Sequence, residues 1–174
     1  MIPKRRPEFA AMLNWSDMHY SDYDPLELLS ISGGEKKTDN FRIVKLPTET
    51  VDHKYKIKFF VSGVAYLSSL AKEDISNLNS DSALTFDFES DNGSDKNAVA
   101  IIKVKGNVKI GYYPKYLNED LRALYNTEVR DSIEVKLLKV NSDAPEQYKI
   151  LCEMTCDWPA DFYPFQSGKF SILR

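Results

Sequence analysis

The segment from residue 84 to residue 125 constrains the fold of this chain more than any other part of the sequence. An alternating strand, ALTFDFES, is followed by the acidic turn DNGSDKNA and by a second strand, VAIIKVKG. A glycine turn then leads to a third strand, NVKIGYY, and to a helix near residues 115–125. Short strands joined by tight turns are typical of an antiparallel sheet, so the sequence predicts a mainly β domain.

Further strands are predicted on both sides of this segment. FRIVKL and YKIKFFVSGVAY precede it, with residues 68–78 as a connector that holds a short helical turn, and IEVKLLKV and YKILCEMTC follow it. Six or seven short strands with one or two helices fit a small, closed or nearly closed β-barrel of the OB or SH3 type. The residues expected in its shared core, with a bulge between Ile101 and Val104, are Val99, Ile101, Val104, Ile110, Ile133, Val135 and Leu137.

The two ends are predicted to decorate this barrel. Residues 1–56 form an N-terminal extension in which FAAMLNW and DPLELLSIS are short helices. Asp24-Pro25 supplies the N-cap and the first residue of the second helix, and Gly33-Gly34 ends it. Residues 156–174 form an irregular, aromatic C-terminal arm that covers an open sheet edge or a helix. This arm is also a candidate surface for a protein partner or for self-association.

Composition narrows the classes of function. A chain of 174 residues with 43% hydrophobic content buries one ordinary core with extensions. Its net charge of −3 argues against a broad basic surface, so a nucleic-acid contact must come from a local patch. No apolar run is long enough to span a bilayer or to serve as a signal peptide, so no membrane partner is expected.

Two cysteines, Cys152 and Cys156, lie four residues apart on a predicted strand. An even spacing places both thiols on one face, where they are expected to be reduced and buried. Only His19 and His53 are available to join them, which falls short of a zinc-site pattern. We therefore expect no metal, no cofactor and a cytoplasmic, reducing location.

Enzymatic interpretations find little support in the sequence. There is no phosphate-binding loop of the Walker type and no Ser/His/Asp arrangement. Four acids in and before the turn, Asp87, Glu89, Asp91 and Asp95, offer a weak magnesium alternative, since acids at strand edges are usually solvated. The chain is expected to bind rather than catalyse.

The turn of residues 91–97 admits two interpretations. In the first, its short polar side chains only hold the backbone, because Asn and Asp readily bond neighbouring backbone groups. In the second, Asp95 or Asn97 also faces a groove and accepts a hydrogen bond from a ligand hydroxyl. The residues alone leave both interpretations open.

Three ordered motifs surround this turn: Gly63-Val64-Ala65-Tyr66, Asn92-Gly93-Ser94-Asp95-Lys96-Asn97-Ala98 and Ile110-Gly111-Tyr112-Tyr113-Pro114. In their order and separation they resemble the HIRAN domain over roughly residues 57–155. HIRAN domains are small β-barrel modules, fused to helicase-like chromatin remodellers of the DNA-damage response or found as stand-alone prokaryotic proteins. The chain resembles the stand-alone type.

The resemblance implies non-enzymatic binding of single-stranded DNA at its 3′-hydroxyl end, in a repair, mobile-element or defence setting. It implies that Tyr66 stacks on a base, that Asp95 bonds the terminal hydroxyl and that Lys115 lies near a phosphate. Tyr112 or Tyr113, whichever faces outward, adds a second ring. The full set of nucleic-acid-binding residues implied in this way is Tyr66, Asn92, Ser94, Asp95, Asn97, Tyr112, Tyr113 and Lys115.

Two departures from the pattern of the DNA-end binders support an alternative function. Those proteins carry an arginine where this chain has Ala65, and an aromatic residue where it has Ser94. Losing a phosphate-directed cation and half of a stacking pair weakens end binding by about a few kcal/mol. Lys103, Lys105 and Lys109 are candidates to replace some of the charge. The alternative is a protein-interaction or adaptor module, and the charge around Tyr66 and Asp95 distinguishes the two.

Overall fold

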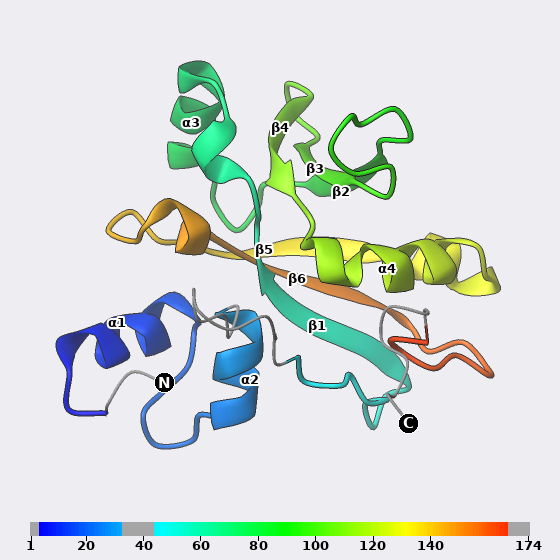
Figure 1. The fold of residues 1–174 in the computed structure, drawn as a ribbon, viewed down its shortest axis with the longest axis horizontal. Helices are drawn as coiled ribbons and strands as arrows, with labels where there is room; N and C mark the ends of the chain where they lie inside the picture. Colours follow the sequence, from blue (N-terminus) through cyan, green and yellow to red (C-terminus); the bar gives the residue numbers. More distant parts are fainter. Residues whose placement is uncertain (1–3, 33–43, 167–174) are drawn as a thin grey trace.

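The computed structural model describes residues 4–32 and 44–166 of the chain. Within these residues the strands form two three-stranded antiparallel sheets, with the orders β1-β6-β5 and β2-β3-β4 (Figure 1). The strands are β1 (Lys54–Phe60), β2 (Leu84–Phe88), β3 (Val99–Lys103), β4 (Val108–Tyr112), β5 (Glu134–Val140) and β6 (Ile150–Asp157). The mainly β architecture is therefore as predicted.

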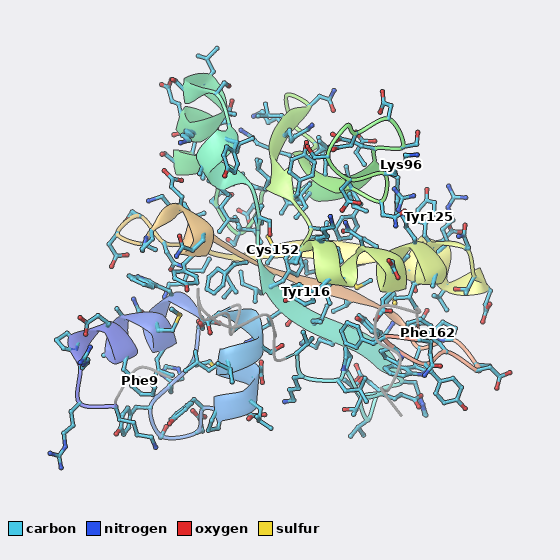
Figure 2. All side chains as sticks on the ribbon, viewed as in Figure 1. Phe9, Lys96, Tyr116, Tyr125, Cys152 and Phe162 are labelled. Atoms are coloured by element: carbon cyan, nitrogen blue, oxygen red, sulfur yellow. The ribbon has the colours of Figure 1, made fainter. Side chains whose placement is uncertain are left out.

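The first sheet is buried on one face and partly covered on the other. On β6, Ile150, Cys152 and Met154 point into the main core, while Leu151 packs on the opposite face with Phe60 of β1. This is the alternation that a pleated strand imposes. Cys152 and Cys156 are both free thiols, and both are buried in the main core, with Cys152 near the centre of the molecule (Figure 2).

The second sheet contains the predicted irregularity. The β3–β4 register shifts between Ile101 and Ile102, which confirms the expected bulge. Val104, however, is 53% exposed and belongs to the turn after β3. Its assignment to the core is wrong because β3 already ends at Lys103. The other predicted core residues lie in the main core or pack against it.

Two corrections concern the chain between β1 and β2. The Gly-x-x-Tyr motif does not continue the strand, because Gly63 has a φ of +76° and leads into a short 3-10 helix, η1 (Val64–Tyr66). A side chain at Gly63 would also lie 3.1 Å from the ring of Tyr112. The connector that follows holds a full helix, α3 (Ser69–Ser76), capped by the Ser68 hydroxyl.

The two sheets meet at one corner of a shared core. An isolated bridge pairs Ser62 with Tyr112, and the Val61 N–H donates to the Ile150 carbonyl at 2.9 Å. Among the described residues no strand ladder closes the six strands into one barrel, so the OB- or SH3-like barrel is not confirmed. Among the described residues, the helical segments that follow β4 in the chain are η2 (Lys115–Leu117), α4 (Asn118–Tyr125), η3 (Glu128–Ser132) and η4 (Glu146–Tyr148).

The N-terminal helices lie on the other side of the first sheet (Figure 1). They are α1 (Pro7–Trp15) and α2 (Pro25–Ile31), and the Asp24 carboxylate caps α2 by accepting from the Leu26 N–H at 2.9 Å. The predicted strand at residues 41–46 is wrong for residues 44–46, which have no regular structure. Residues 41–43 and the glycine pair at 33–34 lie outside the described residues.

Of the predicted C-terminal arm, residues 156 and 157 belong to β6, and residues 158–166 follow it as an irregular segment that packs against the core. Trp158 and Phe162 contact the buried ring of Tyr55, with ring centroids 5.8 and 5.9 Å away. The Phe165 N–H donates to the Asp120 carboxylate of α4 at 3.0 Å. No helix within residues 4–32 and 44–166 is long and apolar enough to cross a membrane.

Candidate functional site

The acidic turn holds its own backbone, as its composition predicts. The Asn92 side-chain oxygen accepts from the backbone N–H groups of Ser94 at 3.0 Å and of Asp95 at 3.1 Å. One Asp95 carboxylate oxygen accepts from the Asn97 N–H at 3.0 Å. These bonds close successive small rings, so the turn has a defined shape without any ligand.

Tyr112 of β4 connects this turn to the strand beside it. Its hydroxyl donates to the Glu89 carboxylate at 3.2 Å and accepts from Lys109 Nζ at 3.2 Å. Asn92 donates to the same Glu89 carboxylate at 2.8 Å, and Lys109 forms an ion pair with it. Partial burial alone would raise the pKa of Glu89, but the hydrogen bonds from these three side chains lower it. Glu89 is therefore an ionised centre that joins turn and strand.

The segment formed by η2 and α4 supports the turn from the other side. The Asn118 amide donates to the second Asp95 oxygen at 3.4 Å, and Lys115 Nζ lies 3.9 Å from that oxygen. The Arg122 guanidinium donates to the backbone carbonyls of Asn97 and Ala98, both at 3.2 Å. The Asp95 carboxylate is thus fixed from three directions, while the Lys115 side chain remains 70% exposed.

A surface groove of about 550 Å³ lies between the η1–α3 segment and β4. In Figure 1, α3 lies on one side of β4 and the acidic turn on the other. Tyr66 and Leu70 line the groove and are 94% and 76% exposed. Tyr112 and Lys109 form part of the opposite wall. Tyr112 therefore belongs to both the groove and the turn, and it brings Tyr66 and Asn92 into one surface region.

Of the two adjacent tyrosines, Tyr113 is the one that does not reach the surface. It is 2% exposed, and its ring packs edge-on against Phe59 and Phe86 at 4.6 and 5.3 Å. Its N–H donates to the Val99 carbonyl beyond the end of β4. The bulge between β3 and β4 interrupts simple alternation. We therefore remove Tyr113 from the candidate site and keep Tyr112.

The sequence analysis missed the supporting side chains. The sequence indicates Glu89 only as a weak magnesium ligand, and it gives no motif that includes Asn118 or Arg122. The last two are four residues apart, which places them on one face of α4, so helical spacing could have found them. The described residues hold no group of three His, Cys, Asp or Glu side chains able to bind a metal ion.

A polar turn and a groove lined by two tyrosines lie next to each other on this mainly β scaffold. A family model of the HIRAN domain matches residues 54–158, more than half of the chain. The chain therefore belongs to the HIRAN domain family, and HIRAN domains are nucleic-acid-binding modules.

Two solved structures are similar to this chain. One is a protein from Lactobacillus plantarum, 16% identical, with a TM-score of 0.42, covering 59% of this chain and 96% of that protein. The other is the HIRAN domain of human HLTF, 16% identical, with a TM-score of 0.42, covering 58% of this chain and 74% of that one. A comparison with curated proteins finds no significant match.

Proposed function

We propose that this protein binds single-stranded DNA at a free 3′-hydroxyl end, without catalysing a reaction. The observation that carries the proposal is the position of Tyr66. Its ring is 94% exposed beside a groove whose other wall, Tyr112, is bonded to the turn that holds Asp95. An exposed ring stacks on any base and contributes about 1–3 kcal/mol per base.

In this proposal Asp95 binds the terminal hydroxyl of the DNA, and Lys115 binds a phosphate. The Asp95 carboxylate accepts one hydrogen bond from the Asn97 N–H at 3.0 Å and one from the Asn118 side-chain amide at 3.4 Å. A carboxylate has about four acceptor sites, so it retains capacity for a terminal hydroxyl. Lys115 is highly exposed and only 3.9 Å from that carboxylate, a position from which its ammonium group can reach a phosphate. A 3′-phosphate would instead place negative charge against Asp95.

The affinity is expected to be modest because the cations around the site already have acidic partners. Lys109 pairs with Glu89, and Lys115 lies next to Asp95. At Ala65, where DNA-end binders carry an arginine, Lys72 Nζ lies 3.1 Å from the backbone carbonyl and also pairs with Glu146 at 3.6 Å. One to three phosphate contacts give a log–log salt slope of only about −1 to −2.

Fluorescence anisotropy with oligonucleotides of one sequence, ending in a 3′-hydroxyl or a 3′-phosphate, tests the proposal. The hydroxyl end should bind more tightly. Tyr66→Ala should lose about 1–3 kcal/mol of binding free energy without unfolding the protein. Tyr163→Ala, at a 66% exposed tyrosine of the arm, is the matched control and should change nothing. Asp95→Asn should remove the preference for the hydroxyl.

Equal binding of both ends, or no binding at tens of micromolar, would refute the proposal and favour a second candidate, a protein-interaction module. That candidate is supported by the paired lysines and by Leu70, an exposed apolar side chain on the same groove as Tyr66. Sedimentation velocity of wild type and Tyr163→Ala would then test self-association through the arm.

A further inference from the structure

We propose that the groove between η1–α3 and β4 takes the nucleotide next to the DNA end, and that Lys109 is its phosphate contact. Lys109 reaches this phosphate by exchanging its intramolecular partner, Glu89, for the ligand. The inference rests on the proposed function and extends it to a second nucleotide and to an ionic contact that limits affinity.

The shape and chemistry of the groove suit a nucleotide. Tyr66 and Leu70 give one wall two exposed apolar surfaces, and Val108 contributes to the other wall. Lys109 is a cation on this second wall. A base against apolar and aromatic side chains, with its phosphate near an ammonium group, is the usual arrangement in single-strand grooves. Tyr112 lines the groove and accepts from the Asn92 side chain of the turn at 3.4 Å, so the groove lies next to the proposed end site.

Lys109 has the capacity to make this contact. Its ammonium group has three donors, of which two are used, by Glu89 and by the Tyr112 hydroxyl. Its side chain is 37% exposed, whereas that of Glu89 is 17% exposed. The cation is therefore the more accessible member of the pair, and it faces the groove.

Glu89 acts as an internal competitor for the phosphate. Asn92 and Tyr112 both donate to its carboxylate, so Glu89 is held in place and does not follow Lys109 outward. A partly exposed ion pair contributes little to stability, which makes the exchange inexpensive. Each bound phosphate must nevertheless draw Lys109 away from a fixed negative charge.

The variant Glu89→Gln tests this directly, because glutamine keeps an acceptor for Asn92 and Tyr112 but removes the competing charge. DNA affinity should rise by about two- to fivefold, the range of one exposed ionic contact. The log–log salt slope should become more negative by about 0.7, the value for one phosphate on a single strand. Lys109→Met should lower the DNA affinity and make the log–log salt slope less negative.

Two controls separate a local contact from a general change of charge. Asp157→Asn alters the net charge by the same amount at another lysine pair, Lys54–Asp157 at 2.5 Å, and should leave binding unchanged. Oligonucleotides whose last two linkages are uncharged methylphosphonates should abolish the gain seen with Glu89→Gln.

The outcomes distinguish this inference from the function on which it rests. Wild type that discriminates 3′ ends, with a Glu89→Gln variant of unchanged affinity and salt slope, would overturn the inference and leave the proposed function standing. An equal gain from Asp157→Asn would overturn it as well. Failure of both wild type and Glu89→Gln to bind any oligonucleotide would refute both.

Discussion

Helix α4 contacts two segments of very different character on two of its faces. On one face, Asn118 and Arg122 bond the acidic turn of the candidate site. On another, Asp120 accepts the Phe165 N–H of the C-terminal arm. The arm packs by its aromatic side chains, of which Phe162 lies at the end of the molecule near the start of β1 (Figure 2).

The two contacts differ in how well their charges are compensated. Arg122 donates to two backbone carbonyls of the turn and lies over the ring of Phe88, so both its charge and these carbonyls have partners. Asp120 is only 6% exposed, and burial raises the pKa of its carboxyl to about 6, although the bond from Phe165 opposes this shift. The hydroxyl of Tyr55, beneath the arm, has no hydrogen-bond partner. We infer that ionisation of Asp120 destabilises the folded protein, because burial of the charged carboxylate costs more than the bond from the Phe165 N–H returns.

The largest expected effect tests the arm side. Asp120→Asn should stabilise the protein by about 3 kcal/mol at neutral pH, from a pKa raised from 3.8 to about 6. The folded state binds the Asp120 proton more tightly than the unfolded state. The stability from this group is therefore fully present below pH 3.8 and is lost as the pH rises to about 6. Urea unfolding of wild type and variant across this range measures the difference.

The stabilisation by Asp120→Asn should disappear in the most acidic samples, because the wild-type Asp120 carboxyl is then protonated in both the folded and the unfolded protein. Asp161→Asn, at an exposed position of the same arm, serves as the matched control and should show no such pH-dependent gain. A gain that is equal at all pH values would mean that burial of the Asp120 charge is not its cause.

An intermediate effect is expected on the turn side. Arg122→Met keeps the aliphatic stem but loses both bonds to the Asn97 and Ala98 carbonyls, so it should cost about 2 kcal/mol of folding free energy. Thermal unfolding measures this loss. Arg130→Met removes an exposed arginine that lies over Tyr125, and it should cost less than about 1 kcal/mol. Equal losses would show that α4 does not hold the turn through Arg122.

The smallest effect concerns the turn itself. Asn92→Ala removes the acceptor of two backbone N–H groups at a partly exposed position and should cost about 1 kcal/mol of stability. It should also reduce the preference for a 3′-hydroxyl end, because Asp95 loses one of its constraints. Ser94→Ala keeps the backbone N–H that Asn92 bonds and should preserve that preference. A variant Asn92→Ala with full discrimination would show that Asn92 does not orient Asp95.

Much of the fold could be predicted because its signals are local. The alternation in β5 and β6, the Asp24 cap and the backbone bonds of Asn92 depend on residues a few positions apart. The family motifs likewise identified Tyr66, Asp95 and Lys115 as one candidate group. The helix α3 was recognised only as a helical turn, because its few apolar residues form no clear amphipathic pattern.

The sequence by itself determined the mainly β class, the polar turn and the aromatic motif beside it, since these follow from short-range periodicity and turn chemistry. Only the tertiary structure decided that Tyr113 is buried while Tyr112 faces the groove, because a bulge between two strands interrupts the alternation. It also decided that Lys109 is paired with Glu89, two residues twenty positions apart. Such a pair depends on the register of strands that meet only after folding, and no local pattern encodes it.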